Sequence, residues 1–228
     1  MRDGDASPAA YARFGGVLYL IIIVLGLFGE VGRGGLIVTG DPAATAARIR
    51  ASEWLWRATI AGNLVHLSCA VALTAILYAL LRPAGRGLAL MGAFFDLASI
   101  ALEAISKLAL LAALFFLGRA EYLKALEPAQ REALSYLSIR LHAYGFGLSL
   151  IFFGCGCLVF GYLIFRSGFF PRVLGILLQV AGVCYLVNSF ALLVAPRFAD
   201  AIFPLVLVPA FIGEAALCVW LIVKGVRR

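Results

Sequence analysis

The stretch LALMGAFFDLASIALEAISKLALLAALFFL, from Leu88 to Leu117, decides the fold of this chain. It is longer than the about 20 apolar residues that a membrane-spanning helix needs. Its charged residues are Asp96, Glu103 and Lys107, which lie within about 60° of one another on one face of a helix. Because a charge at the bilayer centre costs about 2.5–3.5 kcal/mol, this face is predicted to point into a helix bundle and to mark a polar centre there.

The composition extends this interpretation to the whole chain. Of its 228 residues, 64% are hydrophobic and 14% are charged, whereas soluble domains average about 45–50% apolar and about 25% charged residues. The first apolar segment continues without a signal-peptide cleavage site, so it is predicted to be a permanent helix. We predict an all-α membrane protein, a single domain over residues 1–228. Its six transmembrane helices are predicted at about 11–38, 56–81, 87–117, 134–165, 173–195 and 202–223.

The distribution of basic residues predicts the orientation. Two loops and the C-terminal tail contain basic residues without acidic ones: Arg82 and Arg86, Arg166 and Arg172, and Lys224, Arg227 and Arg228. The remaining loops mix both signs, so the N-terminus and the C-terminus are predicted to be cytoplasmic, in a multi-pass protein of the bacterial inner (plasma) membrane. The net charge of +7 is dispersed, which makes the lipid bilayer the expected partner and excludes nucleic acid. The oligomeric state stays open.

Two loops on the predicted extracytoplasmic side contain helix signals. Asp41-Pro42 is an N-cap followed by proline at the first helical position, which predicts a short extracytoplasmic helix over residues 42–52. No helix breaker follows Pro128 for several turns, so the third and fourth helices are predicted to form an extended hairpin with its tip near Pro128. Two prolines in the sixth helix predict a kink there.

Polar side chains from all six spans fall mainly in the outer half of the predicted bundle. Ionisable residues inside a membrane mark binding sites and transport pathways. We therefore predict a charge-balanced polar site that is open to the extracytoplasmic side. Its ligand-binding residues are predicted to be Glu30, Arg33, Arg57, Asn63, His66, Glu103, Lys107, His142, Asn188 and Glu214.

The buried charges balance, as a low-dielectric interior favours. The opposing groups are the acids Glu30, Asp96, Glu103 and Glu214 and the bases Arg33, Arg57, Lys107 and Arg140. The spacings of Glu103 with Lys107, and of Glu30 with Arg33, allow pairing within one helix. Glu214 has no such partner, so it is expected to pair with Arg33, Arg57 or Lys107 across the bundle, or to be protonated. Asp96 stands apart, toward the cytoplasmic side.

Three functions remain open. The favoured one is binding or transport of a small solute or a lipid-like, amphipathic ligand. The second is a membrane-embedded enzyme that uses a buried His/Glu acid–base pair, with His66 or Glu103 as candidates and no nucleophile identified. The third is a structural or interaction subunit whose charges are packing ion pairs. No catalytic residue is assigned, and no metal or cofactor is predicted, because the histidines are few and the known metal and nucleotide motifs are absent.

Three stretches resemble one protein family. They are RFGGVLYLIII (Arg13 to Ile23), GDPAATAARIRASEWLWR (Gly40 to Arg57) and GYLIFRSGFFPRVLGILLQVAG (Gly161 to Gly182). The chain resembles, over nearly its whole length, the bacterial membrane family known as domain of unknown function 4386. The resemblance implies an integral membrane protein without an established activity, and it assigns no catalytic residue.

Overall fold

The computed structural model describes residues 7–226, which are almost entirely helical and contain no strand. The elements are α1 (Pro8–Gly34), α2 (Pro42–Ala51), α3 (Glu53–Leu81), α4 (Arg86–Leu117), η1 (Glu121–Ala125), α5 (Pro128–Ser167), α6 (Arg172–Val194), α7 (Pro196–Ile202), η2 (Leu205–Leu207) and α8 (Val208–Val223). Six stretches are long and apolar enough to cross a membrane: α1, α3, α4, α5, α6 and the combined η2–α8 segment. The prediction of an all-helical protein with six membrane spans is confirmed.

The first span ends earlier than the predicted position 38. α1 stops at Gly34, and the chain turns at Gly35, where the amide of Leu36 hydrogen-bonds the Arg33 carbonyl at 2.9 Å. Glycine is the residue that most readily leaves a helix. The four residues after Gly34 therefore belong to the connection that leads into α2.

The sixth span is interrupted rather than only kinked. α7 ends at Ile202, Pro204 lies in the following turn, and α8 begins at Val208. Pro204 would remove a backbone hydrogen bond inside a helix, which explains the interruption. Pro209 lies in the first turn of α8, where the missing N–H has no helical partner to lose.

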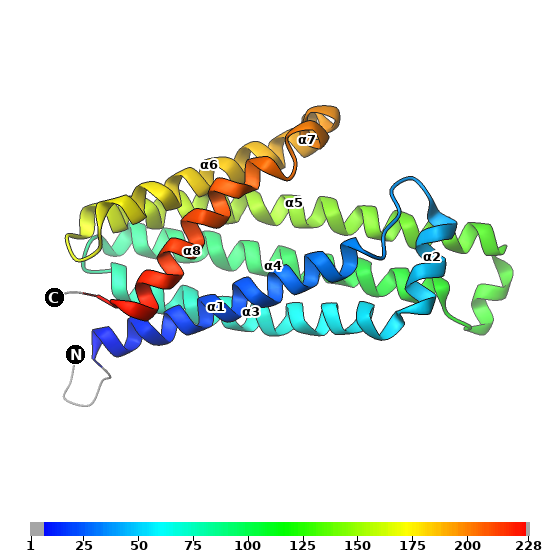
Figure 1. Cartoon of the computed structure of the whole chain (residues 1–228), viewed down its shortest axis with the longest axis horizontal. Helices are drawn as coiled ribbons and strands as arrows, with labels where there is room; N and C mark the ends of the chain where they lie inside the picture. Colours follow the sequence, from blue (N-terminus) through cyan, green and yellow to red (C-terminus); the bar gives the residue numbers. More distant parts are fainter. Residues whose placement is uncertain (1–6, 227–228) are drawn as a thin grey trace.

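The six spans form a closed ring in which each packs against two neighbours, in the order α1, α3, α4, α5, α6, α8 and back to α1. Figure 1 shows an elongated bundle with both chain ends at one end, which we call the terminal end. The opposite end carries α2 and η1, and we call it the α2 end. In the same view α8 crosses from α7, beside α6, to the first turns of α1.

At the α2 end, the helix α2 covers the side of the bundle. Asp41 caps it, and the Asp41 side chain accepts a hydrogen bond from the Ala44 amide at 2.9 Å. α2 is joined to α5 by the ion pair of Arg50 with Glu132, whose charged atoms are 2.9 Å apart. These contacts attach α2 to the hairpin that α4 and α5 form.

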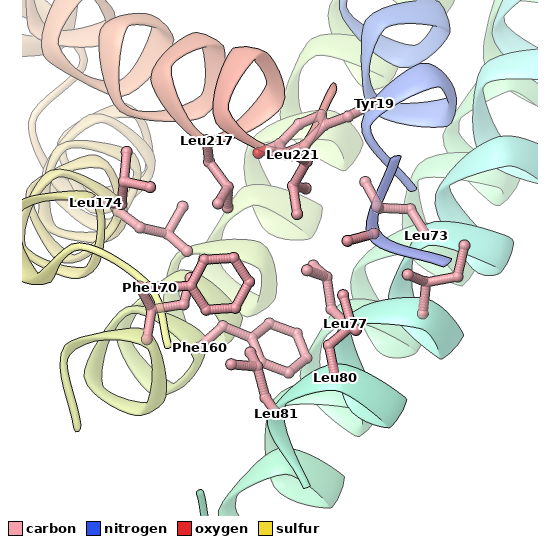
Figure 2. Close-up of a cluster of buried hydrophobic side chains, with 14 of the residues drawn as sticks. Tyr19, Leu73, Leu77, Leu80, Leu81, Phe160, Phe170, Leu174, Leu217 and Leu221 are labelled. Atoms are coloured by element: carbon pink, nitrogen blue, oxygen red, sulfur yellow. The ribbon is translucent and has the colours of Figure 1, made fainter. Parts of the chain in front are cut away.

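Two apolar clusters occupy the interior. The cluster toward the terminal end, shown in Figure 2, joins α1, α3, α5, α6 and α8 through residues that include Tyr19, Leu73, Leu77, Leu81, Phe160, Leu174, Leu217 and Leu221. The cluster at the α2 end contains Trp56, Ile60, Leu110, Leu114 and Ile139. Along α3, Asn63 and His66 lie between Ile60 of one cluster and Leu73 of the other. The buried Asn63 therefore lies between the two apolar clusters along α3.

Candidate functional site

On α4, Lys107 and Glu103 form a buried ion pair with Nζ and Oε1 3.0 Å apart. The four-residue spacing of the helix brings the two side chains together. The Lys107 ammonium also lies 5.3 Å from the centre of the Phe146 ring on α5, a distance that allows a cation–π contact. The charge of Lys107 is thus stabilised from its own helix and from its neighbour.

His142 on α5 reaches across to the same turn of α4. Its Nδ1 lies 3.1 Å from Ser106 Oγ and 3.3 Å from the Ser106 carbonyl oxygen. A carbonyl oxygen only accepts, so Nδ1 carries the hydrogen. The Ser106 hydroxyl donates to the Glu103 carbonyl at 2.7 Å. Close approach is possible because residue 145 is glycine, where a Cβ would lie 2.9 Å from Ser106 Cβ.

On the α1–α3 side, the buried guanidinium of Arg33 donates from Nη1 to Asn63 Oδ1 at 2.7 Å. From Nη2 it donates to the carboxylate of Glu30. The side chain of Arg33 is 4% exposed, whereas that of Glu30 is 61% exposed. Gly29 leaves the space for this contact, since a Cβ there would lie 2.8 Å from Asn63 Nδ2. A buried cation is therefore neutralised by an exposed carboxylate.

These groups belong together. Arg33 and Lys107 both lie close enough to His142 for their charges to act on its ring. We call the set Arg33, Asn63, Glu103, Lys107 and His142 the ion-pair cluster. Four spans, α1, α3, α4 and α5, contribute to it.

Other residues that the sequence assigns to the site lie elsewhere. Arg57 pairs with Glu53 at 2.7 Å, and both side chains are more than half exposed. Its position is about 120° around α3 from Asn63, which explains why it faces outward. His66 donates from Nδ1 to the Ile22 carbonyl at 2.9 Å and so ties α3 to α1. Asn188 is half-buried on α6.

Glu214 does not meet the cationic partner that the sequence suggests. Its carboxylate accepts a hydrogen bond from the Tyr185 hydroxyl, and the Tyr19 hydroxyl also lies beside it. Arg140, counted among the balancing bases, is exposed and lies over the Tyr144 ring. The single balanced centre predicted from the sequence is therefore divided in two. The ion-pair cluster contains the buried bases, and Asp96 and Glu214 lie apart from them.

Three residues that contact the predicted site residues are missing from the set predicted from the sequence: Ser106, Phe146 and Tyr185. Ser106 follows Glu103 by three residues and therefore lies on the same helix face, which is a usable signal. Phe146 and Tyr185 come from other helices, and their roles depend on the packing of α5 and α6 against their neighbours. Within residues 7–226, no three His, Cys, Asp or Glu side chains gather as a metal-binding group.

The comparisons with known proteins give a family and no activity. A protein of Archaeoglobus fulgidus, described as an uncharacterized protein, is 31% identical over 78 residues. That match covers 34% of this chain and 44% of the relative, so the chain spans less than half of the relative's length. No solved structure matches. The model of one family matches residues 14–225, and the chain therefore belongs to the family described as Domain of unknown function (DUF4386).

Proposed function

We propose that this multi-pass membrane protein binds or transports a small or amphipathic molecule that carries an anionic group, and that the ion-pair cluster is its binding site. The observation that supports the proposal is the pairing of Arg33. Its guanidinium is buried, and its carboxylate partner Glu30 is mostly exposed. A ligand anion can take the place of Glu30 on this guanidinium.

The chemistry favours a carboxylate or phosphate as the ligand group. The planar guanidinium presents paired N–H donors that match the oxygens of such anions. The Glu30 side chain is mostly exposed, so its carboxylate can return to solvent without a desolvation cost of its own. An unpaired buried cation is costly, so an anion has to replace Glu30 when it leaves.

An apolar part of the ligand has a surface to occupy on the outside of α1 and α3. A groove of about 370 Å³ runs along α1 and α3, lined by Leu18, Leu64, Val65, Ser68, Cys69 and Ala72. Its lining is almost entirely apolar, which suits an acyl chain and favours an amphipathic ligand over a purely polar solute.

The enzyme alternative has weaker support. A serine nucleophile would donate its hydrogen to a histidine base. Here the Ser106 hydroxyl donates to the Glu103 carbonyl, and the His142 Nδ1 that faces Ser106 already carries a hydrogen. The pair is therefore arranged to join α4 to α5 rather than to activate a nucleophile.

The proposal is tested by thermal unfolding of the full chain in detergent, with oleate as the probe and its uncharged methyl ester as the control ligand. Oleate is expected to raise Tm and the ester is not, because only the anion replaces Glu30. When the free oleate concentration is a hundred times its Kd, binding raises the free energy of unfolding by about 2.7 kcal/mol.

Variants separate a binding role from a packing role. Arg33→Gln should abolish the oleate shift, Glu30→Gln should preserve or enlarge it by removing the competing carboxylate, and the exposed-pair control Arg57→Gln should leave it unchanged. If Arg33→Gln lowers the Tm measured without ligand but keeps the full rise in Tm with oleate, the ion-pair cluster only stabilises the helix packing and the proposal is wrong.

A further inference from the structure

Two carboxyl groups lie inside the bundle away from the buried bases. Asp96 on α4 is 7% exposed and Glu214 on α8 is 9% exposed. Glu214 lies close enough to Asp96 for its charge to act on it. Within residues 7–226 neither acid forms an ion pair. Two acids therefore share one low-dielectric region without a cation.

The surroundings of Asp96 leave one of its oxygen atoms without a hydrogen-bond partner. Oδ1 is fully buried and has no donor among the described residues. It points at α5, where a Cβ on Gly156 would lie only 2.2 Å away. The glycine makes room for this oxygen, and the α5 backbone then closes the space around it.

The second oxygen of Asp96 has one polar contact, with the hydroxyl of Thr74. Thr74 Oγ1 lies 3.3 Å from Asp96 Oδ2 and 2.9 Å from the Ala70 carbonyl oxygen. A threonine hydroxyl has one hydrogen, which the Ala70 carbonyl and Asp96 Oδ2 share as acceptors. The hydrogen bond to Asp96 is the longer of the two, so it offsets little of the cost of burying a charged carboxylate.

None of the described titratable groups that face the two acids can supply a positive charge, because they are tyrosines and a cysteine. They are Tyr19 from α1, Cys157 from α5 and Tyr185 from α6, while α3 contributes the hydroxyl of Thr74. A charged carboxylate in such surroundings is strongly disfavoured unless a cation accompanies it. The backbone of Gly156 against Oδ1 leaves no room for the six or more oxygen ligands that cations such as Ca²⁺ and Mg²⁺ prefer.

We propose that Asp96 and Glu214 form a proton-binding pair inside the helix bundle. Each acid holds an exchangeable proton, and the ring of Tyr19, Thr74, Gly156 and Tyr185 shapes the site. The pair is separate from the ion-pair cluster, so the inference does not rest on the ligand proposed there. It gives the protein a means of linking its conformation to protonation.

Infrared spectroscopy of the full-chain protein in an ester-free detergent at neutral pH tests the proposal, because a protonated carboxyl has a C=O stretching band that a carboxylate lacks. The wild-type band should be present and should shift in D₂O as the protons exchange. Asp96→Asn and Glu214→Gln should each remove part of it. The control Glu103→Gln should leave it unchanged, because Glu103 is paired with Lys107.

Asn is nearly isosteric with a protonated Asp, so Asp96→Asn should also unfold within a few degrees of the wild-type Tm. The proposal is overturned if the wild-type protein lacks the band at neutral pH, if the band survives in both Asp96→Asn and Glu214→Gln, or if it fails to shift in D₂O. Should either variant fail to fold, the wild-type spectra in H₂O and D₂O decide by themselves.

Discussion

Glycines determine, residue by residue, where the buried polar groups fit. Gly29 lets Asn63 and Arg33 approach each other, and Gly145 lets α5 approach Ser106. Gly156 makes the closest approach of this kind, to Asp96. A methyl group at any of these positions would displace a polar side chain from its only buried place.

The variant Gly156→Ala tests this directly. Its Cβ would lie 2.2 Å from Asp96 Oδ1, so the carboxyl group has to move, and we expect a destabilisation of about 1–3 kcal/mol. Unfolding in detergent, followed by circular dichroism, measures it. The double variant with Asp96→Ala should cost less than the sum of the single changes. Additive costs would show that Asp96 is not the group displaced.

Trp56 provides a second test at a single residue. It is fully buried, and its Nε1 donates to the Leu110 carbonyl of α4 at 3.0 Å. Trp56→Phe removes this hydrogen bond and should lower the stability by about 1 kcal/mol. The neighbouring Trp54 is 73% exposed, so Trp54→Phe is a matched control that should change stability little. Equal losses in both variants would contradict the assigned role of Trp56.

At the level of the elements, glycines allow the backbone of α6 to lie close to the backbones of its neighbours α5 and α8. Gly175 and Gly182 on α6 face Gly161 and Gly154 on α5, and Gly213 on α8 meets the Leu177 carbonyl. Small residues let the backbones of membrane helices approach closely and pack by van der Waals contact. This packing holds α6 between α5 and α8 and thereby positions Tyr185 against Glu214.

Gly175→Ala is expected to separate α5 from α6. Its Cβ would lie 2.5 Å from the Gly161 carbonyl oxygen, and backbone atoms cannot rotate away, so we expect a loss of about 1–3 kcal/mol. Gly87→Ala on α4 is the control, because nothing lies within 4 Å of the added methyl. Chemical unfolding in detergent compares the two, and a Gly175→Ala protein as stable as the control would argue against the close α5–α6 contact.

The spans themselves follow from the sequence, because an apolar stretch of sufficient length in a bilayer has few alternatives to a helix. The Glu103–Lys107 pair follows too, since both residues lie on one helix. The partners of Glu214 do not, because they depend on α8 packing beside α1 and α6, and no local pattern reports which distant helices are neighbours. The exposure of Arg57 could have been inferred from its angle around α3 relative to Asn63.

For the whole molecule, six spans place both chain ends at one end of the bundle (Figure 1). The basic residues near that end predict that it faces the cytoplasm. A fluorescent protein fused after residue 228 should therefore fluoresce, and alkaline phosphatase fused there should be inactive. An active phosphatase would reverse the orientation and would place the α2 end in the cytoplasm.

The interior of the whole molecule is divided by charge. The buried bases Arg33 and Lys107 and their paired acids lie on α1 and α4, whereas Asp96 on α4 and Glu214 on α8 form no ion pair among the described residues. Under the two proposals, the buried ionisable groups, whose burial costs stability, bind an anion or a proton. In the proposed function, the buried guanidinium of Arg33 holds a ligand anion.

Native mass spectrometry of the protein released from detergent micelles tests that claim most directly. The wild-type protein and the Arg57→Gln variant are expected to retain a bound anionic molecule of one defined mass, and Arg33→Gln is expected to lose it. The same bound species on wild-type and Arg33→Gln protein, or no bound species on the wild-type protein, would contradict the claim.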